Sequence, residues 1–207
     1  MDLIEKATIL HYHRHRIGQF RPGTVEALGW RNMNSQQLRF QTLIKAGNLN
    51  GATILDIGCG YGDLKAFLDL HFSGFEYTGI DQMPEFITEA RRRYDGHART
   101  VFFQTDFSTA ALPQFDYVFA SGVLGYRCNN ESFYTGMIGK LYDSAGIALA
   151  FNMLDKNRFP PHDLLVGHDR EAVLAFCREL SPRVECFDDY LEDDFTVLMY
   201  RNEVGGQ

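Results

Sequence analysis

Short apolar runs alternate with stretches of helical periodicity from residue 53 onward. Runs of apolar, β-branched and aromatic residues predict strands, which cover residues 53–57, 76–81, 100–106, 115–121 and 146–154. The last of these is largely apolar, as expected for a strand at the centre of a parallel sheet. Apolar residues at helical spacing predict helices over residues 63–72, 84–94 and 131–145. The pattern is that of an α/β fold with a parallel sheet.

The end of the chain departs from this alternation. A helix is predicted over residues 170–180, followed by strands over residues 183–191 and 194–201 with a short acidic turn between them. So short a gap cannot hold a parallel crossover, so the last two strands are expected to form an antiparallel hairpin. No repeat, low-complexity tract or linker interrupts the chain. We therefore expect one domain, in which residues 1–50 form an N-terminal helical cap and residues 51–207 form the α/β body.

Composition and charge narrow the class of protein. Hydrophobic residues make up 45% of the 207 residues and charged residues 23%, which is enough to bury a core. The net charge of −7 argues against a nucleic-acid partner held by its phosphates, although residues 1–50 alone carry seven Lys/Arg against three Asp/Glu. The four cysteines form no CxxC pair, and neither a signal peptide nor a membrane-spanning stretch is recognisable. A soluble, cytoplasmic protein is expected.

The loop after the first strand carries glycines and carboxylates together. Residues 54–64 read ILDIGCGYGDL, with glycines at positions 58, 60 and 62. The dinucleotide fingerprint G-x-G-x-x-G would require a third glycine where Asp63 stands. Asp56 and Asp63 would also repel a pyrophosphate. A ligand without phosphate and with positive charge fits better, and S-adenosylmethionine offers an ammonium, a sulfonium, a ribose diol and an adenine.

Acidic residues also end the next two strands. Asp81 follows the glycines by about 20 residues, where a carboxylate can accept both ribose hydroxyls. Asp106, in the tripeptide TDF, can accept a bond from an adenine amino group while Phe107 covers the ring. Because parallel strands end at the same edge of a sheet, these side chains are expected to form one ligand site.

These motifs resemble those of the class I S-adenosylmethionine-dependent methyltransferases. ILDIGCGYG, YTGID, TDF and FDYVFAS occur in the order of that family and are followed by its terminal hairpin, so the resemblance covers residues 35–201. It implies a doubly wound, mostly parallel seven-stranded sheet in the order 3-2-1-4-5-7-6, with strand 7 antiparallel. The nearest likeness is to small bacterial and archaeal methyltransferases. The resemblance also implies S-adenosyl-L-methionine as cofactor and S-adenosyl-L-homocysteine as product.

The resemblance also carries a set of cofactor-binding residues. The stretch QQLRFQTLIKAGNLNGATILDIGCG is similar to quinone-biosynthesis O-methyltransferases, in which an Arg before the glycines holds the cofactor carboxylate. Arg39 stands at that place, and a solvated helical Arg is the alternative. Cys59 is expected to pack under the cofactor, since methyl transfer needs no covalent intermediate. The predicted cofactor-binding residues are Arg39, Asp56, Gly58, Cys59, Gly60, Asp81, Gln82, Asp106, Phe107 and Ser121.

The acceptor is expected to be a small molecule. Residues 120–126 read ASGVLGY and lack the N/D-P-P-Y stretch with which many amino-methylating nucleic-acid enzymes hold a base. The acceptor would then lie between the cap and the loops after the fourth and fifth strands. The residues expected on this side are Trp30, Tyr126, Arg127 and His162, with core packing as the alternative for Trp30.

No catalytic residue is assigned by the sequence. A hydroxyl acceptor would need a base, and Tyr126, His162 and His168 are the loop candidates. His11 and His15 are four residues apart, but without a third ligand they are expected to lie at the surface, and no metal site is predicted.

Several functions and one property of the cap remain open. The alternatives to a small-molecule enzyme are an RNA or protein methyltransferase that uses the basic cap, and a non-catalytic cofactor-binding protein. A nicotinamide dehydrogenase is disfavoured by the missing third glycine. The glycines and proline of residues 18–29 suit a mobile lid. The oligomeric state is not predicted.

Overall fold

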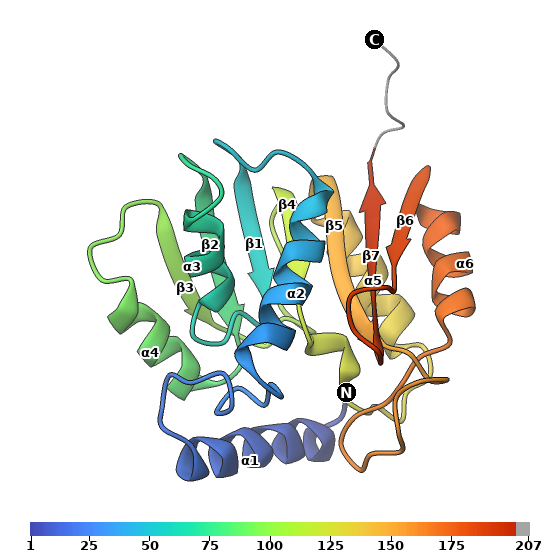
Figure 1. Ribbon diagram of the computed structural model, residues 1–207, viewed down its shortest axis with the longest axis horizontal. Coiled ribbons are helices and arrows are strands. Elements are labelled where there is room, and N and C mark those ends of the chain that lie inside the picture. Colours follow the sequence, from blue (N-terminus) through green and yellow to red (C-terminus); the bar gives the residue numbers. More distant parts are fainter. Residues whose placement is uncertain (202–207) are drawn as a thin grey trace.

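A seven-stranded sheet lies at the centre of the computed structural model, which describes residues 1–201 (Figure 1). The strand order is β3-β2-β1-β4-β5-β7-β6. The strands are β1 (Thr53–Ile57), β2 (Glu76–Asp81), β3 (Thr100–Gln104), β4 (Phe115–Ala120), β5 (Ala145–Leu154), β6 (Arg183–Phe187) and β7 (Asp194–Tyr200). Strand β7 runs antiparallel to both of its neighbours, while the pairs among β1 to β5 are parallel. The predicted order and the antiparallel last strand are confirmed.

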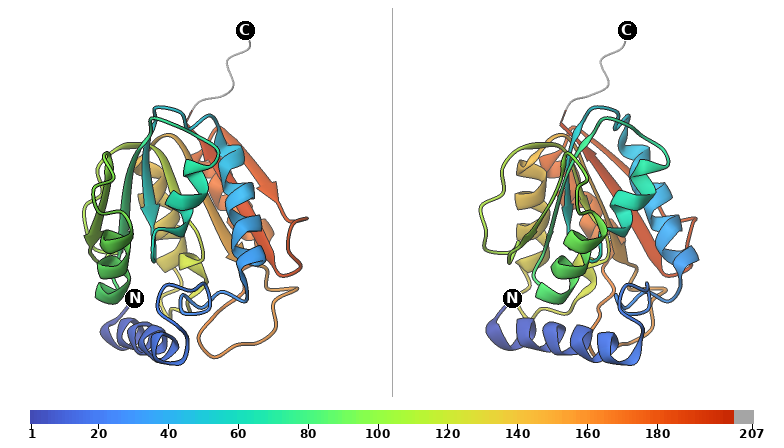
Figure 2. Two further views of the ribbon diagram at one scale, coloured as in Figure 1. Left: turned by 60° about the vertical axis from the view of Figure 1, so that its left-hand side comes forward. Right: turned by 90° about the vertical axis from the view of Figure 1, so that its left-hand side faces the viewer.

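Helices cover both faces of the sheet (Figure 2). One face carries α2 (Met33–Leu43), α3 (Asp63–Asp69) and α4 (Pro84–Arg93), and the other carries α5 (Phe133–Asp143) and α6 (Arg170–Leu180). Strand β4 shows why two layers form. Its Tyr117 and Phe119 belong to the first core, whereas Val118 and Ala120 belong to the second. Because successive side chains of a strand point to opposite faces, this apolar run needs cover on both sides.

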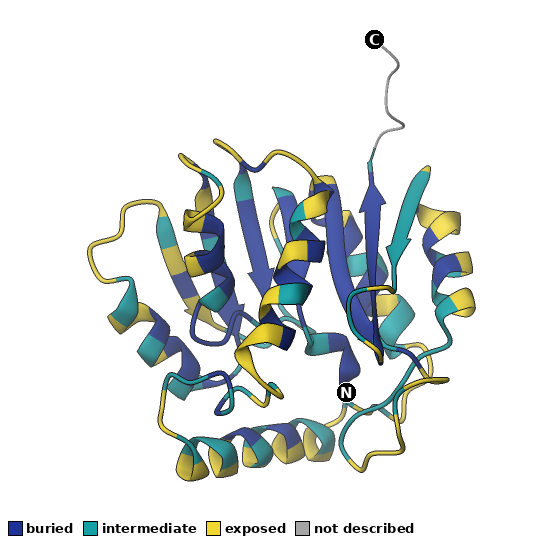
Figure 3. Cartoon of the chain, in the orientation of Figure 1, coloured by how far each residue is buried: buried dark blue, intermediate teal, exposed yellow. Residues whose placement is uncertain are grey.

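The central strands are the most buried part of the molecule (Figure 3). The bounds of the seven strands lie close to those predicted, except that the edge strand β6 ends at Phe187 rather than at residue 191. The chain leaves the sheet there because the carboxylate of Asp188 bonds to the guanidinium groups of Arg158 and Arg170, and Tyr190 turns back to Asp194. The hairpin connection is therefore longer than the sequence pattern indicated.

The first helix, α1 (Leu3–Gln19), lies across the edge at which the parallel strands end (Figure 1). It begins with a capping box, in which the Asp2 side chain accepts from the Glu5 backbone N–H and the Glu5 side chain accepts from the Asp2 backbone N–H. Only Ile9 and His13 of α1 are buried. Helix α2 instead packs against β5 and β7, so only the residues before α2 lie across this edge. Among residues 1–201, no helix is long and apolar enough to cross a membrane.

Candidate functional site

A cavity of about 600 Å³ opens at the carboxyl edge of the sheet, within the usual size range of ligand pockets. Its wall is formed by α1, the glycine loop and the loops after β2, β3, β4 and β5. Every residue predicted to bind the cofactor lines it, and so do Trp30, Tyr126 and His162 from the predicted acceptor side. Arg127 does not line it. The topology thus gathers the predicted residues around one space.

The glycine loop turns sharply and packs tightly at the same time. Gly58 and Gly60 have φ angles of 69° and 54°, a conformation that side-chain-bearing residues rarely adopt. A Cβ on Gly58 would lie 2.0 Å from Cγ1 of Val123, and one on Gly60 would lie 2.7 Å from Cδ2 of Leu28. The loop therefore requires glycine both for its backbone shape and for its contacts with the loop after β4 and with the cap.

Two buried carboxylates stand beside this loop. Asp81 accepts the backbone N–H of Gly60 at 3.0 Å and that of Met83 at 2.8 Å, which leaves each of its oxygens able to accept a further bond. Burial raises the pKa of Asp81 to about 6. Burial, together with the nearby charges of Asp81 and Asp63, raises the pKa of Asp56 to about 7, although a hydrogen bond from Tyr77 opposes the rise. Such a site favours a cationic ligand over a phosphate.

Asp106 is in contact with the cap. Its Oδ2 accepts from Nζ of Lys6 at 2.7 Å, and its Oδ1 accepts from the backbone N–H and the hydroxyl of Ser108. Burial acts to raise the pKa of Asp106, but the hydrogen bonds from Lys6 and Ser108 outweigh it and hold the pKa below its usual value. Helix α1 is thus tied directly to the strand end where the adenine is expected.

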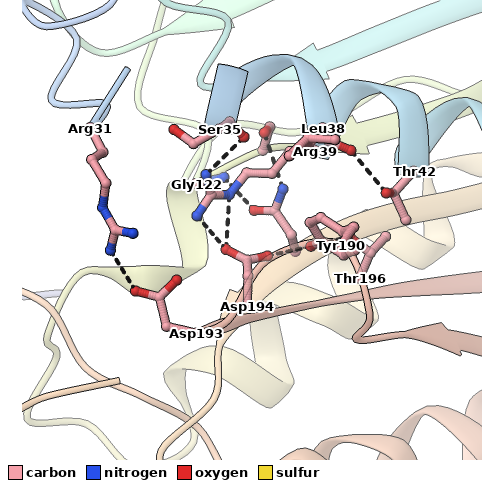
Figure 4. A network of polar contacts seen from close by, with 12 residues as sticks. Arg31, Ser35, Leu38, Arg39, Thr42, Gly122, Tyr190, Asp193, Asp194 and Thr196 are labelled. Atoms are coloured by element: carbon pink, nitrogen blue, oxygen red, sulfur yellow. Dashed lines mark hydrogen bonds and ion pairs between the residues drawn. The ribbon is translucent and has the colours of Figure 1, made fainter. Parts of the chain in front are cut away.

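Arg39 lies in the wall of the cavity rather than in solvent (Figure 4). Its Nε and Nη2 donate to Oδ2 of Asp194 at 2.8 and 2.5 Å, and its Nη1 donates to the carbonyl of Ser35. The guanidinium also lies over the ring of Trp30, 4.9 Å from the centroid. The alternative of a solvated helical Arg does not match this burial. The role of Arg39 toward the cofactor carboxylate stays a prediction.

A histidine that the sequence analysis did not single out lies on the acceptor side of the cavity. Nε2 of His13 is 2.7 Å from the hydroxyl of Tyr126, and its ring also contacts Phe86 edge to face. Burial lowers the pKa of His13 to about 4 and raises that of Tyr126 far above its usual range. His13 is the middle one of the three histidines in the segment HYHRH. The signal that points to it is the spacing of four residues from Ile9, the other buried position of α1.

The remaining candidates are distributed differently. Nδ1 of His162 accepts the backbone N–H groups of residues 164 and 165, and Nε2 of His168 bonds to the carbonyl of Leu124. The exposed guanidinium of Arg127 donates to the carbonyls of His162 and Leu165, so it braces the loop after β5 instead of facing the cavity. Burial raises the pKa of the Cys59 thiol, as suits a packing role. His11 and His15 are both exposed.

Comparisons with known proteins agree with this architecture. A family profile described as "Methyltransferase domain" matches residues 55–141. The Mycobacterium tuberculosis protein named "Putative methyltransferase Rv1506c" is 32% identical over 157 residues, covering 71% of this chain and 92% of that protein. Trans-aconitate 2-methyltransferase of Methylobacterium nodulans is 31% identical over 144 residues, covering 67% of this chain and 54% of that protein.

Solved structures of methyltransferases share the fold. Magnesium protoporphyrin IX methyltransferase of Synechocystis PCC 6803, with bound S-adenosylhomocysteine, has a TM-score of 0.69 at 19% identity and covers 95% of this chain and 100% of that one. The N-methyltransferase NodS of Bradyrhizobium japonicum WM9 has a TM-score of 0.64 at 18% identity and covers 94% and 98% of the two chains. With its sheet order, its glycine loop and its relatives in agreement, this chain belongs to the class I S-adenosylmethionine-dependent methyltransferases.

Proposed function

We propose that the chain transfers the methyl group of S-adenosylmethionine to an oxygen or nitrogen of a small molecule bound beside it in the 600 Å³ cavity. The observation that carries this proposal is the pair of buried carboxylates, Asp56 and Asp81, next to a loop whose glycine positions have no room for a side chain. When bound, S-adenosylmethionine supplies a methyl group on a positively charged sulfur. An acceptor attacks the methyl carbon in line and displaces the sulfur.

The residues of the cavity fit the parts of this donor. Asp81 has lone pairs left for the ribose hydroxyls, and Asp106 with Phe107 lies at the end of the next strand for the adenine. Arg39 offers its remaining N–H groups to the carboxylate of the methionine part. The residues of the chain therefore bind and orient the donor, and alignment of the reacting groups supplies much of the rate enhancement in such transfers.

The cap is better suited to cover a small ligand than to bind a polyanion. Lys6, Arg14, Arg31 and Arg39 each pair with a carboxylate, at distances of 2.5 to 2.9 Å. The positive charge of residues 1–50 is thus largely used within the protein, which speaks against an RNA-binding surface. In this role α1 excludes water from the cavity, and the residues before α2 act as a lid on the body of the same domain.

Methyl transfer from labelled S-adenosylmethionine tests the proposal. The purified chain would be incubated with the labelled donor and, separately, with a small-molecule extract of bacterial cells, with total RNA and with a protein fraction. We expect label in the small-molecule fraction and S-adenosylhomocysteine in equal amount, and much less of both with Asp81→Ala at sub-saturating donor. Label confined to RNA or protein would refute the small-molecule acceptor, and binding of the donor without any turnover would identify a non-catalytic protein.

A further inference from the structure

Three polar side chains of the cap and of the loop after β4 line the cavity on the side where the acceptor is expected. His13 and Arg16 are three residues apart on α1 and therefore share a face of the helix, and both line the cavity. Tyr126 reaches the same place from the loop after β4, and its hydroxyl contacts Nε2 of His13 at 2.7 Å. These groups differ in chemistry from the acids of the cofactor half, so they bear on what the acceptor is.

The surroundings of His13 fix which nitrogen carries its proton. Its Nδ1 is buried and has no hydrogen-bond partner within residues 1–201. A buried N–H without a partner is rarer in proteins than a buried acceptor without one. Nδ1 is therefore the unprotonated nitrogen, and the proton is on Nε2. Nε2–H then donates to the oxygen of Tyr126. The hydroxyl proton of Tyr126 is left free for another acceptor.

Among the described residues, none of the candidates His13, Tyr126 and His162 is suited to act as a general base, and Asp193 on this side is held in an ion pair with Arg31. The bare Nδ1 of His13 is sealed from the cavity, and the proton of Tyr126 is held firmly because burial raises its pKa far above the usual range. Nδ1 of His162 accepts two backbone N–H groups, so the neutral ring carries its proton on the other nitrogen. Asp56 and Asp81 stand at the ends of β1 and β2, and Asp81, which also faces Tyr126, is assigned to the ribose of the donor. An alcohol or ammonium acceptor would have to lose a proton to such a base.

Arg16 supplies a positive charge that no carboxylate within residues 1–201 neutralises. Its Nε and Nη2 both donate to the backbone carbonyl of Glu26, at 2.9 and 2.6 Å, and its guanidinium lies 4.3 Å from the ring centroid of Phe20. Throughout residues 1–201 it forms no ion pair, unlike Lys6, Arg31 and Arg39 in the same cavity. A cation held in place but unpaired favours an anionic ligand.

We propose that the acceptor is an ionised carboxylic acid, which Tyr126 and Arg16 orient and which leaves as its methyl ester. This inference rests on the function proposed above. One carboxylate oxygen accepts the hydrogen bond from Tyr126. The other oxygen forms a bond to the methyl carbon while the carbon–sulfur bond breaks and its electron pair stays on sulfur. The negative charge of the acceptor and the positive charge of the sulfonium both disappear, and no proton is transferred. His13 is a positioning residue that holds the hydroxyl of Tyr126.

The alkali test of the transferred methyl group distinguishes the acceptor classes. Methyl esters release volatile methanol in dilute alkali, whereas methyl ethers and N-methyl products do not. The small-molecule extract and a panel of carboxylic acids, including trans-aconitate, with alcohols and amines of matched skeleton, would be labelled and then treated with alkali. We expect alkali-labile label. Alkali-stable label would overturn the carboxylate proposal and leave the methyltransferase function intact. Absence of label from every small molecule would overturn both.

Variants test the assigned roles on whichever acid is labelled. Tyr126→Phe and Arg16→Gln are each expected to lower kcat/KM for the acid about ten- to a hundredfold while the Kd for S-adenosylhomocysteine stays unchanged. His13→Gln, whose amide can replace Nε2, should retain much more activity than His13→Ala. Equal losses in these two variants would reduce His13 to a structural role, and unchanged kcat/KM in Tyr126→Phe would overturn the assignment.

The pH profile supplies an independent readout. The ionisable groups that face the pair of His13 and Tyr126 are Tyr12 and Arg16 of α1 and Asp81 at the end of β2. Without a base, log kcat/KM for the acid, measured with saturating S-adenosylmethionine, should be flat between about pH 6 and 9. A rise with unit slope in that range would show a required deprotonation and would contradict the proposal.

Discussion

The carboxylate of Asp194 accepts two hydrogen bonds from the guanidinium of Arg39, at 2.8 and 2.5 Å, inside the wall of the cavity (Figure 4). The hydroxyl of Tyr190 donates to the other oxygen of Asp194, so the carboxylate is itself held in place. Arg39 therefore has a fixed orientation, and only its remaining N–H groups are left for a ligand. Fixed guanidinium groups bind carboxylates with defined geometry, which a lysine cannot reproduce.

Replacement of Arg39 tests its predicted contact with the methionine carboxylate. Arg39→Lys should weaken the binding of S-adenosylhomocysteine about tenfold while leaving adenosine, which has no carboxylate, nearly unaffected. The measurement is calorimetry with both ligands. Because the pair with Asp194 is buried, the variant should also melt at a lower temperature, and titrations belong well below that transition. If both ligands weaken equally, or neither does, Arg39 serves only the internal ion pair.

Asp81 is predicted to hold the ribose. Asp81→Ala removes the carboxylate and should weaken the binding of S-adenosylhomocysteine by about 1.5–3 kcal/mol, which is about ten- to a hundredfold. Since Asp81 also holds the backbone of Gly60 and Met83, thermal unfolding must confirm that the variant is folded. Asp95→Ala, which replaces an exposed aspartate after the end of α4, is a matched control. Unchanged affinity in folded Asp81→Ala would rule out the ribose contact.

The buried acids predict how pH acts on stability and binding. The pKa values of Asp56 and Asp81 are raised from 3.8 to about 7 and about 6, so the folded protein holds protons that the unfolded chain has lost. Their neutral forms stabilise the ligand-free protein fully below about pH 4, and this contribution is lost as pH rises through 6 and 7. A cationic ligand favours the ionised forms.

Calorimetry can test this pH dependence of binding. Binding of S-adenosylmethionine should release protons between pH 5 and 7 and should strengthen as pH rises through that window. Titrations in two buffers of different ionisation enthalpy measure the proton release. The neutral sulfur of S-adenosylhomocysteine should give a smaller effect. Proton uptake, or affinity that falls with rising pH, would contradict the assignment of these acids to the cofactor site.

Helix α1 is expected to close when the cofactor binds. Most of its residues are exposed or half-buried (Figure 3), and its ties to the body include Lys6 with Asp106 and Arg14 with Glu85. Backbone amides of residues 1–34 should therefore exchange with solvent more slowly when S-adenosylhomocysteine is bound. The amides of β4 provide the reference, since the last four residues of that strand are buried in the sheet. Equal exchange of residues 1–34 with and without ligand would argue against a lid.

Local patterns in the sequence predicted the strands and helices after residue 50 to within a few residues, and the family resemblance supplied the order of the strands in the sheet. Helix α6 begins and ends where predicted, because Asp169 caps it and its apolar residues have helical spacing. The acids at the ends of β2 and β3 were placed at one site because parallel topology brings those ends to the same edge. Such features depend on neighbouring residues and on a family topology, and both can be recognised in a single chain.

Long-range partners could not be predicted in this way. Asp194 lies 155 residues from Arg39, and Lys6 lies 100 residues from Asp106. The burial of His13 likewise depends on how α1 crosses the sheet edge, because its own helix shows no strong apolar stripe. Charge and hydrogen-bonding capacity are visible in a sequence, but the choice of partner is set by tertiary packing.

A crystal structure of the chain with S-adenosylhomocysteine tests the central claim most directly. We predict that the ribose hydroxyls lie within hydrogen-bond distance of Asp81, the ligand carboxylate lies beside Arg39, and the sulfur faces the half of the cavity lined by His13 and Tyr126. A ligand bound in the reverse direction, bound outside this cavity, or absent at saturating concentration would contradict the account.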